Sequence, residues 1–294
     1  MRWGVAAGIV VAAAVWGRDG AVEERVKAGA NAEANATANA NAMADADASA
    51  RASAEVEAAV VGGDEAVAVA VAGDLEIYVV RATRQASHGP LVFLTGSCTH
   101  PLTYVNAFGH AAAEHGGLVA LQGDLPCKAD PSLRRWSPDT IATSARIDAA
   151  LLAADVHSTT DITLIGYSQG AERAEWLARR FPAKYTRFVL MAGPVVPAAA
   201  RFAGARAMAL LAGHGDVRDN MADGARRLRR ANIPATYIEL PGTHHGELSP
   251  AADAFVSQAL DWLDANAIPT DAALANASIT TPRARGAPPK HRAH

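Results

Sequence analysis

The segment from 162 to 170, ITLIGYSQG, places a serine between two glycines directly after a run of apolar residues. Gly-x-Ser-x-Gly between a strand and a helix is typical of a nucleophile elbow, a turn so tight that side chains at the glycine positions would clash with the neighbouring elements. Gly166 and Gly170 meet this steric demand, and a strained backbone would present the hydroxyl of Ser168 above a sheet. The pattern predicts attack by a serine on a carbonyl carbon. The alternative is a strand-to-helix turn with an incidental serine.

A serine hydroxyl is a poor nucleophile near neutral pH and needs an adjacent base, which a carboxylate orients. With this kind of elbow the acid and then the histidine follow the serine along the chain. Downstream, LLAGHGDVRDN contains Asp216 and Asp219, and IELPGTHHGELSP contains His244 and His245. We favour Asp216, which comes first after its strand, because Asp219 has the position of a helix N-cap. We favour His245 because the glycine after it lets the loop turn back towards Ser168.

The oxyanion that forms on attack needs backbone N–H donors. One donor is expected from Gln169, where the helix after the serine begins, because helix N-terminal amides face negative charge. The second is expected from the loop GSCTH that follows the apolar run LVFLTG, where Ser97 and Cys98 are both candidates. A histidine such as His100 in this loop would either line the site or cap the loop. The side chains expected to line the site are His100, Tyr167 and His244.

The elements that must position these residues alternate along the chain. Apolar runs predict eight strands, with a hairpin over 65–82 that turns at Gly73-Asp74 and further strands over 91–96, 118–124, 162–167, 187–193, 207–213 and 235–242. Amphipathic patterns predict helices over 102–115, 137–155, 169–185, 219–231 and 249–267. The helix from 137 is expected to begin with Ser137 as cap and Pro138 as its first residue. Such alternation predicts an α/β fold, a mostly parallel sheet with helices on both faces and sites at the carboxyl ends of strands.

On these residues the chain resembles the α/β-hydrolases over about 90–265, and in particular small lidless members such as cutinases and acyl-protein-thioesterase-like esterases, whose elbow often reads Gly-Tyr/Phe-Ser-Gln-Gly. Ser168, Asp216 and His245 match the family's triad positions. The resemblance implies an open site without a cap domain, because only PVVPAAARFAGAR lies where relatives insert a helical cap. The loop GSCTH departs from the His-Gly of many relatives, which affects the donor assignment.

The chain has two cysteines, Cys98 and Cys127. They follow the strands over 91–96 and 118–124, which should be neighbours in a hydrolase sheet. An exported chain with two cysteines favours one disulfide, which would hold the oxyanion loop still. The alternative is two unpaired thiols.

Both ends of the chain differ in composition from the middle. Residues 1–17 carry one basic residue and a short apolar run, which is typical of an export signal, and an uncleaved membrane anchor is the rival interpretation. Residues 18–61 are a low-complexity spacer in which alanine alternates with Asn, Asp, Glu and Ser. Residues 62–268 form the predicted domain, and 269–294 a basic, Pro-rich disordered tail.

Charge and composition exclude some partners. The 294 residues carry a net charge near −3, so no basic surplus predicts nucleic-acid binding. His244, His245 and Glu247 have metal-ligand types but no second cluster, so we expect no metal and no cofactor. We predict an exported monomeric serine hydrolase that cleaves carboxylic esters through an acyl-enzyme, with membrane contact only through an uncleaved anchor. The alternatives are a serine peptidase or amidase, and a non-catalytic binding protein with this fold.

Overall fold

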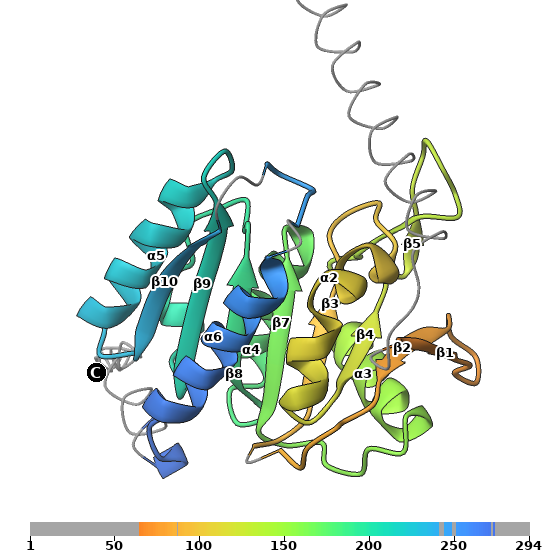
Figure 1. Cartoon of the computed structure of the whole chain (residues 1–294), viewed down its shortest axis with the longest axis horizontal. Coiled ribbons are helices and arrows are strands. Elements are labelled where there is room, and N and C mark those ends of the chain that lie inside the picture. Colours follow the sequence, from red (N-terminus) through yellow and green to blue (C-terminus); the bar gives the residue numbers. More distant parts are fainter. Residues whose placement is uncertain (1–64, 87, 241–243, 249–250, 272, 274–294) are drawn as a thin grey trace, which may run out of the picture. The chain divides into compact units, whose positions relative to one another are not determined.

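The structure, a computed structural model, describes residues 65–86, 88–240, 244–248, 251–271 and 273 (Figure 1). The predicted export signal at 1–17 and spacer at 18–61 lie outside these residues, as does most of the predicted tail. Ala273, which is described, is only 1% exposed, so the compact part continues beyond the predicted boundary at 268.

The prediction of an eight-stranded, mostly parallel sheet is confirmed. Its order is β1-β2-β4-β3-β7-β8-β9-β10, and only β1 and β2 pair in antiparallel fashion with their neighbours. The strands are β1 (Val67–Val69), β2 (Ile77–Val80), β3 (Leu91–Leu94), β4 (Leu118–Leu121), β7 (Ile162–Tyr167), β8 (Tyr185–Met191), β9 (Ala207–Gly213) and β10 (Ala235–Leu240). The strand that carries the elbow, β7, lies near the middle of the sheet.

A second, two-stranded sheet was not predicted. It consists of β5 (Leu125–Pro126) and β6 (Arg134–Arg135), which pair antiparallel within the long connection after β4. Each strand has only two residues, too few for an alternating pattern to be detected in the sequence. This small hairpin carries Cys127 next to the carboxyl end of β3, where the backbone of Thr99 pairs with that of Arg134.

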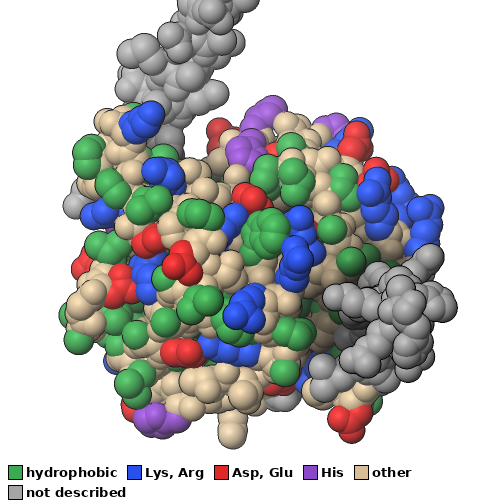
Figure 2. Space-filling view, turned by 180° about the vertical axis from the view of Figure 1, so that it is seen from behind, with side chains coloured by type: hydrophobic (Ala, Val, Ile, Leu, Met, Phe, Trp, Pro, Cys, Tyr) green, Lys and Arg blue, Asp and Glu red, His purple; other side chains and the backbone are tan. Residues whose placement is uncertain are grey.

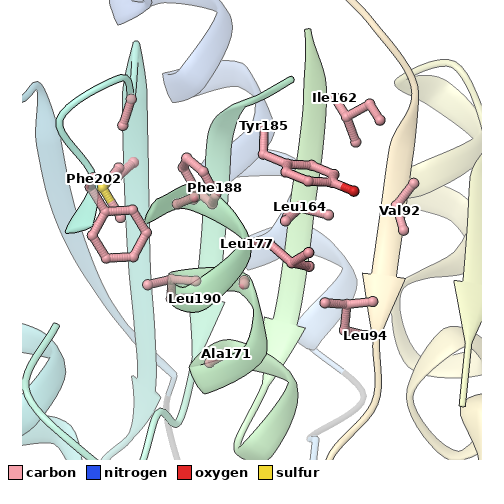
Figure 3. Close-up of a cluster of buried hydrophobic side chains, with 14 of the residues drawn as sticks. Val92, Leu94, Ile162, Leu164, Ala171, Leu177, Tyr185, Phe188, Leu190 and Phe202 are labelled. Atoms are coloured by element: carbon pink, nitrogen blue, oxygen red, sulfur yellow. The ribbon is translucent and has the colours of Figure 1, made fainter. Parts of the chain in front are cut away.

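Helices cover both faces of the large sheet (Figure 1). The helices α3 (Thr140–Ala153), α4 (Gln169–Arg180) and α5 (Arg218–Arg230) pack on one face, and α2 (Pro101–Glu114) and α6 (Ala252–Asn266) on the other. Along β3, Val92 and Leu94 point to the first face while Leu91 and Phe93 point to the second, as the two-residue period of a strand requires. Figure 3 shows Leu177 of α4 packed among strand side chains of the first core. Burial on both faces explains why the strands are continuous apolar runs.

Three predicted helix boundaries are wrong. The helix predicted from 137 begins at Thr140, because the carboxylate of Asp139 accepts the amides of Ile141 and Ala142, both at 2.9 Å, and so caps it in place of Ser137. Helix α4 ends at Arg180 rather than near Tyr185, which already belongs to β8. The next residue, 181, precedes a proline and is therefore disfavoured in the helical region.

The third error concerns Asp219, which was expected to be the N-cap of its helix. The N-cap of α5 is Val217, and Asp219 lies inside the first turn. A negative charge there still interacts favourably with the helix dipole.

The carboxyl ends of the parallel strands meet at one end of the molecule. The loops that follow β9 and β10 carry three exposed histidines, His214, His244 and His245, and Figure 2 shows histidine side chains gathered at this end of the surface. Between β8 and β9 the described chain forms only a short 3-10 turn, η1 (Ala199–Arg201), in agreement with the expected absence of a cap. In the described ranges, no helix is both long and apolar enough to cross a membrane.

Candidate active site

Ser168 lies alone between β7 and α4. Its backbone has φ 48° and ψ −113°, with a positive φ that non-glycine residues rarely adopt. Its side chain leaves the chain where the central strand ends and the helix begins. The strained turn expected of a nucleophile elbow is therefore present at this serine.

Both glycines of the elbow are required by close backbone contacts. A Cβ added to Gly166 would lie 2.6 Å from the carbonyl oxygen of Gly170, and one added to Gly170 would lie 2.0 Å from that of Leu94. Real Cβ atoms do not approach other atoms to within 3.0 Å. The elbow therefore packs directly on its own helix and on the end of β3, and only glycine fits at either position.

Ser168, His245 and Asp216 form a continuous chain of hydrogen bonds. The Oγ atom of Ser168 lies 3.1 Å from Nε2 of His245, and Nδ1 of the same ring lies 2.9 Å from Oδ1 of Asp216. The amide of Val217 also donates to this oxygen at 2.6 Å. The Asp216 side chain is 3% exposed, whereas that of His245 is 49% exposed. A buried acid thus orients a ring that faces both the serine and the solvent.

The electrostatics of the ring agree with this arrangement. The hydrogen bond to Asp216 raises the pKa of His245 above its ordinary value of 6.5, against the opposing effect of partial burial. Because the carboxylate accepts the proton on Nδ1, Nε2 of the neutral ring is left to accept the hydroxyl proton of Ser168. The geometry is that of a general base next to a nucleophile.

The two alternative residues lie outside this chain of contacts. The Asp219 side chain is 96% exposed and its carboxylate lies 3.8 Å from the guanidinium of Arg218. The ring of His244 packs over Gly215, where an added Cβ would be 2.5 Å from Nδ1. The structure thus brings Asp216 and His245 to Ser168, and places their sequence neighbours elsewhere.

The loop after β3 is fixed from several directions. The amide of Cys98 donates to the carbonyl of Arg134 at 2.7 Å, and Cys98 forms a disulfide with Cys127, their Cα atoms 5.8 Å apart. The indole Nε1 of Trp136 donates to the carbonyl of Thr95 at 2.8 Å. The Cys98 amide therefore already donates a hydrogen bond within the protein. The loop is tied to the β5–β6 hairpin and the residue after it at two points, Thr95 and Cys98.

Gln169 connects this hairpin to the elbow. Its side-chain Oε1 accepts the amide of Trp136 at 2.8 Å, and its Nε2 donates to the carbonyl of Trp136 at 3.4 Å. The same tryptophan holds Thr95. Gln169 and the loop after β3, the two segments from which oxyanion donors were expected, are thus joined through one residue.

His100 caps α2. Its Nδ1 accepts the amide of Leu102 at 3.3 Å, and Nε2 lies 3.0 Å from the hydroxyl of Tyr78. Burial lowers the pKa of His100 below its ordinary value. One ring nitrogen therefore caps α2 and the other contacts Tyr78 of β2, and a capping role was the second of the two expectations for this residue.

Tyr167 lies beneath the histidine loop. Its ring centroid is 5.7 Å from that of His245, and its hydroxyl oxygen accepts the amide of Gly246 at 2.6 Å. No group of three or more His, Cys, Asp or Glu side chains in the described part of the chain is arranged to hold a metal ion. His244, His245 and Glu247 accordingly do not form such a group.

Comparison with known proteins bears on the fold. No protein-family model and no curated protein matches this chain. Among solved structures, a mutant of the esterase rPPE matches with a TM-score of 0.55 and 14% identity, covering 76% of this chain and 90% of that one. A hormone-sensitive lipase from a metagenome library matches with a TM-score of 0.53 and 14% identity, covering 74% and 91%. The protein has an α/β-hydrolase fold.

Within this α/β-hydrolase fold, sequence reasoning missed Trp136 and the side-chain roles of Gln169 and Tyr167. The bonds that Trp136 makes span 33 and 41 positions of the chain, and no local pattern encodes contacts of that range. One signal was available for Gln169, because a partly buried amide side chain in the first turn of a helix needs hydrogen-bond partners.

Proposed function

We propose that this protein is a serine hydrolase that cleaves carboxylic esters through an acyl-enzyme. The observation that carries the proposal is the hydrogen-bonded chain from Ser168 through His245 to Asp216 at the carboxyl end of the central strand. The esterase and lipase among the structural neighbours share only the fold at their level of identity. They make ester hydrolysis the first activity to test.

In the proposed reaction Nε2 of His245 takes the proton of Ser168 as Oγ attacks the ester carbonyl carbon. The tetrahedral intermediate collapses when the carbon–oxygen bond to the alcohol breaks, and the alcohol leaves with the proton from His245. Water then attacks the acyl-serine with the same ring as base, which releases the acid and restores Ser168. Asp216 stabilises the imidazolium that forms in each half-reaction.

The oxyanion would be held by two backbone amides. We assign the first to Gln169, the first residue of α4, where the unpaired amides and the dipole of the helix favour negative charge. We assign the second to Ser97, because the other candidate, Cys98, already donates to Arg134. Donors aimed at a developing charge contribute on the order of 10²–10³ to the rate when they are fixed in advance. The disulfide and the contacts of Trp136 would supply that rigidity.

The proposal extends to export of the chain. The Cys98–Cys127 disulfide is compatible with an oxidising compartment, and the sequence of residues 1–17 has the features of a signal. Fusion of residues 1–61 to a reporter that is active only outside the cytoplasm tests this part. A reporter that stays inactive while the fusion is expressed would contradict export.

The test of the chemistry is labelling with a fluorophosphonate, which reacts with an activated serine. The purified chain should gain one adduct by intact mass, and Ser168→Ala should gain none. Ser158→Ala, which removes a hydroxyl from an exposed loop, is the matched control and should label like the wild type. No adduct on a folded wild-type chain would refute the proposal and favour a binding protein.

A series of p-nitrophenyl esters of increasing acyl length, run beside a p-nitroanilide of the same acyl group, then measures substrate preference. Faster cleavage of the anilide than of the ester would replace the proposed esterase with an amidase.

A further inference from the structure

The residue before the proposed nucleophile contacts the residue after the proposed base. The phenol oxygen of Tyr167 accepts the backbone N–H of Gly246 at 2.6 Å, and Gly246 directly follows His245. One side chain of the elbow thus binds the backbone of the loop that carries the histidine. This contact joins two segments that are 79 residues apart in the sequence.

Tyr167 is itself fixed by the core. Its side chain belongs to the cluster beneath α2 and α6 and is 2% exposed. Its ring stacks on that of Tyr104, with centroids 4.5 Å apart and planes 26° from parallel. Tyr104 is 1% exposed and packs edge-on against Phe93 of β3. A stacked aromatic pair that is buried in this way has little freedom to move. The phenol oxygen of Tyr167 is therefore held in a fixed position relative to the sheet.

The loop it holds is packed less tightly. The side chain of His245 is 49% exposed, and residues 244–247 are all exposed. Gly246 has φ +90°, and a Cβ built there would meet no atom within 4 Å. The loop therefore depends on individual hydrogen bonds more than on packing for its position, and the Tyr167–Gly246 bond is the one next to the histidine backbone.

We propose that Tyr167 is a positioning residue for His245. Its hydroxyl fixes the backbone of the histidine loop, and thereby keeps Nε2 within hydrogen-bond distance of Ser168 while Nδ1 remains on Asp216. The inference rests on the proposed function, in which His245 transfers the proton. Tyr167 itself takes no part in proton transfer; burial raises the pKa of its phenol, which stays neutral.

The substitution Tyr167→Phe removes only the oxygen and keeps the aromatic stack. Loss of one hydrogen bond of ordinary strength should let the histidine loop drift, and kcat and the rate of fluorophosphonate labelling should both fall about three- to tenfold. KM should stay within about twofold of the wild-type value, because the Tyr167 hydroxyl binds the loop from beneath and is not a substrate contact.

The matched control is Tyr185→Phe. The hydroxyl of Tyr185 is also buried and lies 2.8 Å from Oγ of Ser144, at the other end of the sheet and among residues of the other core. Both variants lose a buried hydroxyl, so both should lose stability. Only Tyr167→Phe should lose kcat.

A readout independent of turnover is the proton resonance of Nδ1–H of His245, identified by its loss in His245→Gln. In the wild type its bond to Asp216 should protect it from exchange. In Tyr167→Phe it should broaden, and in Tyr185→Phe it should not. An unchanged resonance together with unchanged kcat in Tyr167→Phe would overturn the inference, as would a change in KM alone. Absence of an adduct on the wild type would instead refute the proposed function, and the resonance would still test whether Tyr167 orders the histidine.

Discussion

The substitution Gly170→Ala tests whether the elbow is as tightly packed as its geometry requires. An added Cβ would lie 2.0 Å from the carbonyl oxygen of Leu94 and 2.6 Å from that of Thr95. Since contacts under 3.0 Å do not occur, the helix and β3 must separate by about 3.0 − 2.0 = 1.0 Å. The first oxygen belongs to the last residue of β3 and the second to the residue that follows it, and neither backbone oxygen can rotate away as a side chain would. Overpacking of this kind costs about 1–3 kcal/mol, and the gain from alanine in a helix offsets at most about 1 kcal/mol.

We therefore expect Gly170→Ala to lower the free energy of unfolding by about 2 kcal/mol in urea titrations. The rate of fluorophosphonate labelling should fall much more than stability, about 100-fold, because a displacement near 1 Å at reacting atoms has that effect. Gly224→Ala in α5 is the control. Its Cβ would meet side-chain atoms of Pro197 and Leu210 at 2.7 and 2.8 Å, and labelling should be unchanged. A Gly170→Ala chain with wild-type stability and labelling would refute the steric argument.

Three further predictions concern the same site. Asp216→Asn should reduce the labelling rate by roughly 10³-fold or more and move the acidic limb of its pH profile down, because the carboxylate that raises the pKa of His245 is lost; an unchanged profile would contradict the assigned pairing. The stability of the fold should change with pH in the opposite direction to the activity. The raised pKa of His245 stabilises the folded state fully below pH 6.5, and this stabilisation is lost as the pH rises through the pKa of the folded state. The melting temperature of the wild type, relative to that of His245→Gln, should therefore decline as the pH rises through this interval. Reduction of the disulfide, which links two residues 29 positions apart in the sequence, should lower the free energy of unfolding by about 3–4 kcal/mol. Urea unfolding with and without reductant measures this, and equal midpoints would contradict the prediction.

The sequence was sufficient to predict the sheet because buried parallel strands are continuous apolar runs and the connections between them are short. It was insufficient where two local signals compete. Ser137-Pro138 is a good helix start, but the Asp139 carboxylate satisfies two amides and therefore begins the helix later. The β5–β6 hairpin has no periodic pattern at all, since each strand has two residues. Boundaries of this kind depend on which of several acceptable caps the tertiary structure selects.

For the candidate site, the order of serine, acid and histidine along the chain allowed the three hydrogen-bonded residues to be named. The choice of Asp216 rested on its place directly after a strand, and in the structure that place brings it to the ring of His245. The supporting contacts could not be named, because the bonds of Trp136 and Tyr167 join segments that are distant in sequence. In these two bonds the aromatic side chain is paired with a backbone group, and a backbone group leaves no signature in the residue types.

If Ser168 is acylated as proposed, the half-exposed ring of His245 has a consequence for the fate of the acyl group. In the described chain no cap domain is inserted between β8 and β9, and the proposed base faces solvent. The proposed acyl-enzyme would then react with alcohols and amines as well as with water. Such an enzyme would divide its acyl group among acceptors according to their concentration and reactivity, and in media poor in water it would act as an acyltransferase.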